Sequence, residues 1–290
     1  MQWHRRVLLC LLLLAAMPAW AAALVIRVTG PEPVAAELAS LLTQRLPGVA
    51  VHRSGGSVDL RIAVGTRDFE EALAEAAQTP VVGVALTRRA WLAAAGQRPG
   101  PHTAIFWEPD PVRHLRLARA MMPGARRAGV LLSADDPALV AALRAEAARQ
   151  KLELIIERLG PGDSLARSVN NVLGASDFLL GVDDPDIFSP ATAKTLLLTS
   201  YRHGKPVIGP TAAYVDAGSA ASLVVTLADV ADTLAAWLPE LFRARDVLPP
   251  PRHVDTANVR TNAQVARSLR LSIPPPTALE ALMKTPGGSP

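Results

Sequence analysis

The stretch ASDFLLGVDDPDIFSPATAKTLLLTSYRHGKPVIGPTAAYVDAG, residues 175–218, decides the fold. The apolar run Phe178–Val182 stops at Asp183-Asp184-Pro185, a helical pattern follows, and a second apolar run, Pro206–Ile208, stops at Gly209-Pro210-Thr211. This order predicts a strand, a crossover helix and a second, parallel strand. In open α/β sheets, ligands bind outside the carboxyl ends of the strands. The stretch therefore predicts both a fold and the place of a site.

Apolar runs and amphipathic stretches alternate through the rest of the chain. Many runs are rich in Val and Ile without strict alternation, which is typical of strands buried on both faces of a parallel sheet. Stretches of helical length separate the runs, so the pattern favours βαβ units. The predicted strands cover Leu24–Val28, Leu60–Val64, Val81–Leu86, Thr103–Trp107, Ala128–Leu132, Leu152–Glu157, Phe178–Val182, Pro206–Ile208 and Ser222–Thr226.

Three dipeptides mark where helices begin. Asp110-Pro111, Asp136-Pro137 and Ser189-Pro190 each place a capping oxygen directly before a proline. Proline is tolerated at the first helical position because the N–H that it lacks has no partner in the helix anyway.

The number of predicted strands exceeds one ordinary sheet. A break around Glu108–Pro111 divides them into two similar halves, and Pro249-Pro250-Pro251 forms a second, rigid connector. Residues 274–290 are rich in Pro and Gly, so we expect this tail to fray.

The N-terminus has the pattern of a secretory signal peptide. His4-Arg5-Arg6 is a short basic region, Val7 to Ala16 is apolar, and Ala19-Trp20-Ala21 has the small-x-small pattern of a cleavage site. The apolar run is shorter than the roughly 20 residues of a membrane-spanning helix. We expect residues 1–23 to be removed during secretion, which predicts a periplasmic protein that does not span the membrane; an uncleaved anchor is the alternative.

Composition excludes several kinds of site and partner. The single cysteine, Cys10, lies inside the predicted signal, so the mature chain is expected to have no disulfide and no thiolate nucleophile. Loss of Arg5 and Arg6 lowers the formal charge from +4 by two, and the remaining basic residues form no stripe. Nucleic acid is therefore not an expected partner.

No catalytic motif is visible in the sequence. There is no G-x-S-x-G elbow and no Walker A loop, and no glycine-rich fingerprint follows the first strand. Five histidines remain after the predicted signal (His52, His102, His114, His203 and His253), and no two have metal-ligand spacing. We interpret them as surface or loop residues, and we expect no enzyme, no metal and no cofactor.

Candidate ligand-binding residues follow the predicted strands. Asp183 comes directly after one strand and is the preferred candidate, while Asp184 and Asp186 are interpreted as helix caps. Tyr214 lies just beyond the next strand end, in a loop able to reach the same crevice.

The other candidates belong to the first half of the chain or to the break. Thr66 and Arg67 follow Gly65, and an arginine there is suited to a carboxylate or a phosphate. Trp107 and Glu108 end a strand at the break, where an aromatic face and a carboxylate suit an apolar, cationic or amine-bearing ligand. The alternatives are a solvated arginine, a packed tryptophan and a packed tyrosine.

Three segments carry a resemblance to a known family. They are TAIFWEPDPVRHLRLARAMMPGARRAGVLLS at 103–133, the strand-end motifs between Asp183 and Gly218, and NAQVARSLRLSIP at 262–274. In this order they resemble the ABC transporter substrate-binding protein family that includes tryptophan- and tyrosine-type binding proteins. The resemblance covers roughly residues 103–283. Arg270 stands where the family motif has glycine, and the first lobe lacks a serine-rich ligand loop.

The resemblance implies an α/β fold of the periplasmic-binding-protein type I kind, with two Rossmann-like lobes that have parallel sheets. The N-terminal lobe is expected at 24–107 plus about 227–249, including a helix at Asp229–Arg243. The C-terminal lobe is expected at 108–226 plus about 250–273. Three crossing strands would join the lobes, which would close on a small ligand.

These patterns predict a periplasmic solute-binding protein of an ABC-type uptake system, with a small-molecule ligand and a membrane permease as partner. Asp183 would bind an amine or hydroxyl, Tyr214 and Trp107 would offer aromatic walls, and Thr66 or Arg67 would meet a carboxylate. The alternative is a protein of the same fold that has lost its ligand and acts as an envelope protein-interaction module.

Overall fold

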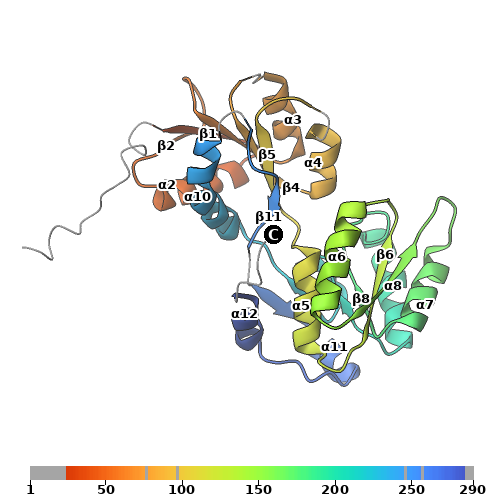
Figure 1. The fold of residues 1–290 in the computed structure, drawn as a ribbon. Coiled ribbons are helices and arrows are strands. Elements are labelled where there is room, and N and C mark those ends of the chain that lie inside the picture. The colour runs from red at the N-terminus through yellow and green to blue at the C-terminus, as the bar shows by residue number, and fades with distance from the viewer. Residues whose placement is uncertain (1–23, 76–77, 96–97, 245–246, 256–257, 285–290) are drawn as a thin grey trace, which may run out of the picture. The chain divides into compact units, whose positions relative to one another are not determined.

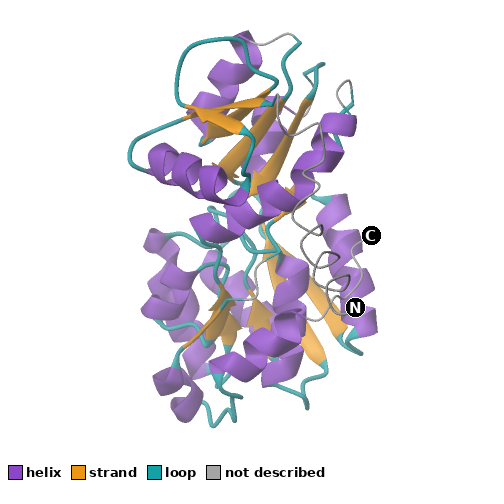
Figure 2. Cartoon of the chain, turned by 90° about the vertical axis from the view of Figure 1, so that its left-hand side faces the viewer, coloured by secondary structure: helices purple, strands orange, loops and turns teal. Residues whose placement is uncertain are grey.

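The computed structural model describes residues 24–75, 78–95, 98–244, 247–255 and 258–284. The predicted signal peptide at 1–23, with Cys10, lies outside these residues. Within these ranges, no helix combines the length and the apolar character that crossing a membrane requires. The chain divides into two compact units (Figures 1 and 2). One contains the chain up to Ala104 together with Ala231–Pro250, and the other contains Ile105–Val230 and the chain from Pro251 onward.

The first sheet has the strand order β11-β5-β4-β3-β1-β2. In this sheet β1 runs parallel to both β2 and β3, and β3 runs parallel to β4. Its strands are β1 (Val25–Thr29), β2 (Ala50–His52), β3 (Leu60–Val64), β4 (Val81–Leu86), β5 (His102–Phe106) and β11 (Arg252–His253). The helices that accompany it in the chain are α2 (Val34–Arg45), α3 (Thr66–Glu75), α4 (Arg88–Ala95) and α10 (Leu227–Arg243).

The second sheet has the order β12-β10-β9-β8-β6-β7, and its strands are parallel except for β12, which runs antiparallel to β10. Its strands are β6 (Arg127–Leu132), β7 (Glu153–Arg158), β8 (Phe178–Leu180), β9 (Val207–Ile208), β10 (Ala221–Leu223) and β12 (Val259–Thr261). Its helices are α5 (Pro111–Met121), α6 (Pro137–Arg149), α7 (Leu165–Ala175), α8 (Pro190–Arg202), α9 (Ala212–Ala217), α11 (Ala263–Ser268) and α12 (Pro276–Lys284).

All the predicted strands are present, with ends shifted by a few residues at most, and the α/β fold class is confirmed. Three strands were missed: β2, β11 and β12. Each is two or three residues long and lies at an edge of its sheet. An edge strand needs little burial, and β2 alternates between exposed and half-buried positions, so it lacks the apolar run that marks the central strands.

The predicted helix starts are also confirmed. The Asp110 carboxylate accepts from the Val112 N–H at 2.9 Å, and the Asp136 carboxylate accepts from the Leu139 N–H at 2.9 Å. At α8 the N-cap is Ser189, whose N–H donates to the Thr192 Oγ1 at 3.0 Å. Each cap therefore satisfies a backbone donor or orients the first turn, as the Asp-Pro and Ser-Pro pairs predicted.

The expectation of a fraying tail was wrong for residues 276–284, which form α12. Leu279 and Met283 are four residues apart on one face of this helix, and both are buried. The Arg113 guanidinium donates to the Met283 carbonyl at 2.7 Å, which ties the helix to α5. Prolines before and at the first turn are compatible with a helix, so proline content alone did not indicate disorder.

Arg270, which replaces the family glycine, has a φ of 54°. This left-handed conformation favours glycine and is uncommon for other residues. The backbone therefore keeps the conformation that the glycine of the family motif would favour, although the side chain differs.

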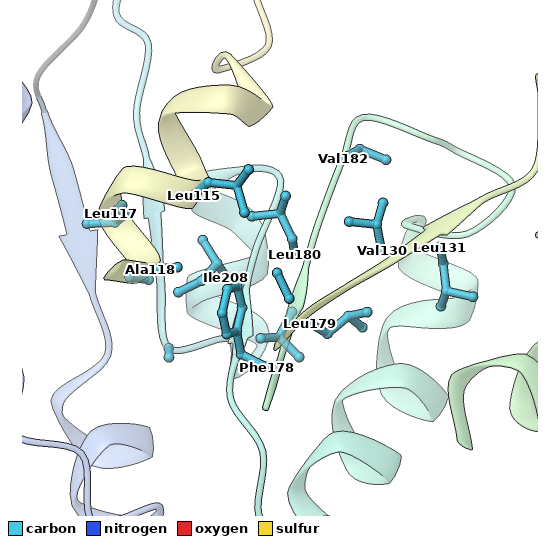
Figure 3. Packing of buried hydrophobic residues seen from close by; sticks show 14 of the residues in the cluster. Leu115, Leu117, Ala118, Val130, Leu131, Phe178, Leu179, Leu180, Val182 and Ile208 are labelled. Carbon is cyan, nitrogen blue, oxygen red and sulfur yellow. The ribbon is translucent and has the colours of Figure 1, made fainter. Parts of the chain in front are cut away.

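The core of the second unit is a continuous apolar cluster that its sheet shares with the surrounding helices, α5 among them. Figure 3 shows Leu115 and Ala118 of α5 beside Phe178, Leu180 and Ile208 of the central strands. All five side chains are fully buried. Packing of this kind is the main favourable term in folding, so this unit has its own hydrophobic core.

A polar side chain with a buried ring, that of His114, lies against this core. His114 of α5 is 1% exposed, and its Nε2 accepts a hydrogen bond from the Leu223 N–H of β10 at 3.1 Å. Because Nε2 is an acceptor, the neutral ring carries its proton on Nδ1. Burial lowers the pKa of His114 to about 3, the Gly181 carbonyl opposes that shift, and the positive charges of His253 and Arg113 add to it. The interpretation of His114 as a surface residue was wrong.

This histidine predicts an acid-dependent loss of stability. The folded chain keeps His114 neutral down to pH about 3, whereas the unfolded chain protonates it below about 6.5. Between these values the unfolded state binds more protons, so the free energy of unfolding falls as the pH falls, by up to about 1.4 kcal/mol per pH unit from this group. Urea unfolding of His114→Gln between pH 7 and 4 should show a shallower slope. Leu115→Ala, a neighbouring core truncation that keeps the histidine, should retain the slope; equal slopes in both variants would contradict the assignment.

Candidate functional site

Each sheet has a place where the direction of strand addition reverses. In the first sheet β2 lies on one side of β1 and β3 on the other, and in the second sheet β7 and β8 flank β6 in the same way. The crossovers on the two sides of such a strand leave a crevice outside the carboxyl ends of the strands, where ligands bind in folds of this class. Each unit therefore has one expected site, after β1 and β3 or after β6 and β8.

At the first of these places, the backbone after β1 passes close to β3. A side chain at Gly30 would lie 2.6 Å from the Val64 Cβ, and φ at Gly30 is 144°, so only glycine fits. Thr66 and Arg67 follow β3 and are exposed at the start of α3. Two of the predicted residues thus lie directly at the reversal point of their sheet.

Arg67 is solvated, as its alternative interpretation held, and is paired on its own helix. Its Nε lies 2.9 Å from the Glu71 Oε1, the hydrogen bond to Glu71 raises its pKa, and its side chain is 88% exposed. Exposed pairs of this kind contribute little to stability. Replacing Glu71 by another anion as the partner of the Arg67 guanidinium would therefore cost little free energy.

At the second place, the loops after β6 and β8 are joined by Asp184. Its carboxylate accepts from the Ser133 N–H and Oγ, both at 2.8 Å, and from the Asp186 N–H at 3.2 Å. Asp184 is 7% exposed. A buried carboxylate with several donors holds its loop in one conformation, so the two strand ends that flank the crevice are fixed to each other.

The helix-cap interpretation of Asp184 and Asp186 was wrong. Ser189 caps α8, and Asp186 also accepts from the Ser133 Oγ, at 3.2 Å. Ser133 was missed by the sequence analysis. Its one signal is its position directly after the predicted strand Ala128–Leu132, the same kind of signal that selected Asp183.

Asp183 lies between two fixed neighbours. Val182 and Asp184 are buried on either side of it, and Asp183 itself is half-buried. The preceding backbone is equally constrained, because a side chain at Gly181 would lie 2.5 Å from the Pro210 Cδ. The carboxylate of Asp183 is therefore carried by a rigid loop at the reversal point, as a binding group requires.

Tyr214 is placed differently from its expected role. It is 6% exposed, its ring packs edge-on against Phe188 with centroids 5.6 Å apart, and its hydroxyl donates to the Ser189 carbonyl at 3.2 Å. Burial raises the pKa of Tyr214. These contacts match the alternative interpretation, in which the tyrosine packs α9 onto the loop before α8.

Trp107 and Glu108 follow β5. Trp107 is 38% exposed, whereas Glu108 is 7% exposed and its Oε1 lies 3.8 Å from the His253 Nε2 of β11. His253 in turn meets the Phe106 ring edge-on, with centroids 5.1 Å apart. The tryptophan thus presents an accessible aromatic face, and the glutamate lies inside, next to β11.

The described residues bring Ser133, Asp184 and Asp186 together and leave Asp183 beside them. Within the same ranges, no three His, Cys, Asp or Glu side chains gather closely enough to hold a metal ion. The second reversal point therefore offers carboxylate oxygens as hydrogen-bond acceptors, and these suit an amine or a hydroxyl group of a ligand.

The Asp184 contacts predict a loss of stability. Asp184→Ala removes a buried carboxylate that accepts three hydrogen bonds, so we expect the free energy of unfolding to fall by about 2–4 kcal/mol. Ser133→Ala keeps the backbone N–H contact and should cost about 1 kcal/mol. Chemical denaturation measures both, and an Asp184→Ala variant as stable as the parent would contradict the role given to this carboxylate.

Comparison with known proteins supports the fold. No protein-family model and no curated protein sequence matches the chain. Among solved structures, a ligand-free, open substrate binding protein with adhesive properties from Clostridium difficile, CD0873, matches with a TM-score of 0.61 and 13% identity, over 86% of this chain and 95% of that one.

Two further structures are similar. An ABC domain in complex with L-Trp from Streptococcus pneumoniae gives a TM-score of 0.55 at 17% identity, over 88% of this chain and 96% of that one. A conserved domain protein from Vibrio cholerae gives a TM-score of 0.54 at 16% identity, over 89% and 97%. The fold of the chain is thus that of type I periplasmic binding proteins, as predicted, and its neighbours in structure include ligand-binding proteins.

Proposed function

We propose that the chain is the solute-binding protein of an ABC-type uptake system, exported by its N-terminal signal to the periplasm and handing its ligand to a membrane permease. The observation that carries the proposal is the position of Asp183, Thr66 and Arg67. They follow β8 and β3, which are the strands next to the reversal point of each sheet. Ligands bind at such points in open α/β sheets.

The two places differ in chemistry. The first offers a hydroxyl and an exchangeable guanidinium, which suit a carboxylate or another anionic group. The second offers the carboxylate of Asp183 on a rigid loop, which suits an amine or a hydroxyl. We propose a small polar ligand that carries an anionic group suited to the first place or an amine or hydroxyl group suited to the second, and the exposed face of Trp107 suits an apolar part.

A ligand that binds at either place would stabilise the conformation that it binds, because it adds favourable free energy to that state alone. Such a protein needs no nucleophile and no general base. The sequence shows no nucleophile paired with a general base, and we propose a binding protein and not an enzyme.

The test is ligand binding to the mature protein. Native mass spectrometry of the purified protein, followed by thermal stability across a panel of amino acids, small acids, amines and sugars, should identify a molecule that co-purifies or raises the melting temperature. Absence of any such molecule, together with capture of a specific envelope protein in pull-down experiments, would favour the alternative of a ligand-free interaction module.

For the ligand so identified, Asp183→Asn and Arg67→Gln should each weaken binding by about tenfold or more, since each removes a charged hydrogen-bonding group. Asp232→Asn changes an exposed carboxylate on α10 and serves as the matched control. Calorimetry measures all three, with unfolding curves to show that the variants fold. Equal affinity of Asp183→Asn and the control would remove Asp183 from the site.

A further inference from the structure

A cavity of about 510 Å³ lies at the opposite end of the second sheet from Asp183. It is open to solvent and is lined by the ends of α5 and α6 and by the segments that lead into β6 and β7. Its lining residues are Arg119, Pro123, Gly124, Ala125, Arg126, Arg149, Gln150 and Lys151. Half of these side chains are cationic and none is acidic, so the cavity is a concave basic surface.

The carbonyl oxygens that would oppose an anion here are already satisfied. Arg119 donates through Nε to the Gln150 carbonyl at 2.9 Å, and through Nη1 to the Pro123 and Ala125 carbonyls at 2.7 and 2.9 Å. These acceptors belong to the turns that follow two helix C-termini, where the backbone carries partial negative charge. Arg119 therefore neutralises the local backbone and leaves the other cations in excess.

Two of the acids near the cavity are held by basic residues that line it or lie next to it, and a third, Glu153, is exposed at the start of β7. Asp177 accepts from the backbone N–H groups of Arg126 and Arg127 at 2.8 and 2.9 Å. Glu146 is 1% exposed and is shared between Arg116 at 2.8 Å and Arg149 at 3.2 Å. Among the described residues, the side chains of Arg126 and Lys151 are exposed and have no ion-pair partner.

We propose that this cavity, the basic pocket, binds a phosphate-bearing anion. Arg126 would approach the phosphate oxygens with its planar guanidinium, and Lys151 would add a point charge from the next turn. Arg149, which is ion-paired with Glu146, would add positive charge beside them. Lys151 has a φ of 55°, so its side chain leaves the end of α6 in a direction that a continued helix would not allow. The pocket is separate from the reversal points, so binding here is independent of the proposed solute site.

Phosphate reaches such a pocket from two sources, a soluble phosphate compound or the headgroup of an anionic lipid. Both present the same oxygens to the same cations, but only the lipid presents them on a surface. Pyrophosphate in solution and vesicles of phosphatidylglycerol therefore separate the two, with phosphatidylcholine vesicles as the neutral control.

The experiment compares three forms of the protein. Arg126→Gln/Lys151→Gln removes two charges from the pocket, and Arg144→Gln/Lys194→Gln removes the same two residue types from exposed positions on α6 and α8. Calorimetry with pyrophosphate and co-sedimentation with vesicles are run at fixed ionic strength, because unspecific attraction is sensitive to salt.

We expect the parent to bind one of the two probes, the pocket variant to bind it about tenfold more weakly, and the control variant to stay close to the parent. Binding of pyrophosphate alone assigns a soluble ligand, and binding of phosphatidylglycerol vesicles alone assigns a lipid headgroup. No binding of either probe, or an equal loss in the two variants, overturns the proposal.

Discussion

The first strand of each sheet is an interior strand with neighbours on both sides, and this constraint shapes the rest of the molecule. β1 and β6 start the two sheets, and the chain adds a strand on one side of each before it adds strands on the other. Crossovers between parallel strands are right-handed almost without exception, so a change of side also changes the face on which the helix lies. The crevice between β1 and β3, and that between β6 and β8, follow from this order alone.

Different interactions hold the backbone in place at the two crevices. At the first, Gly30 lets the backbone pass directly against Val64, and the polar groups are exposed. At the second, Asp184 holds the loop of Ser133 by two hydrogen bonds and leaves Asp183 beside this link. A rigid polar loop loses little entropy when a ligand binds, because its groups are already ordered.

Local chemistry explains what could be predicted from the sequence. Central strands and helix starts depend on neighbouring residues, so apolar runs and Asp-Pro pairs were sufficient to find them. Asp184 was misassigned because Ser133, its partner, lies 51 residues away in the chain. Tyr214 was expected in a loop but lies on α9, and the direction of its ring depends on Phe188, which a linear pattern does not show. The edge strands β2, β11 and β12 are held by hydrogen bonds to a neighbouring strand and not by burial, so an apolar run does not mark them in the sequence.

Each end of the second sheet brings several like charges together, although Arg158 lies at the end of β7 and Asp177 lies directly before β8. Asp136, Asp183 and Asp184 lie where its strands end and where α6 begins, whereas Arg126, Arg149 and Lys151 lie where its strands begin and helices end. Helix dipoles favour acids at the first end and bases at the second, so the same arrangement that stabilises the fold gives each end a chemical preference. The proposed solute site at the first end would favour an amine, and the proposed basic pocket at the second end, once Arg119 has satisfied the carbonyls, would favour an anion. The two proposed binding surfaces thus belong to one sheet and share one core.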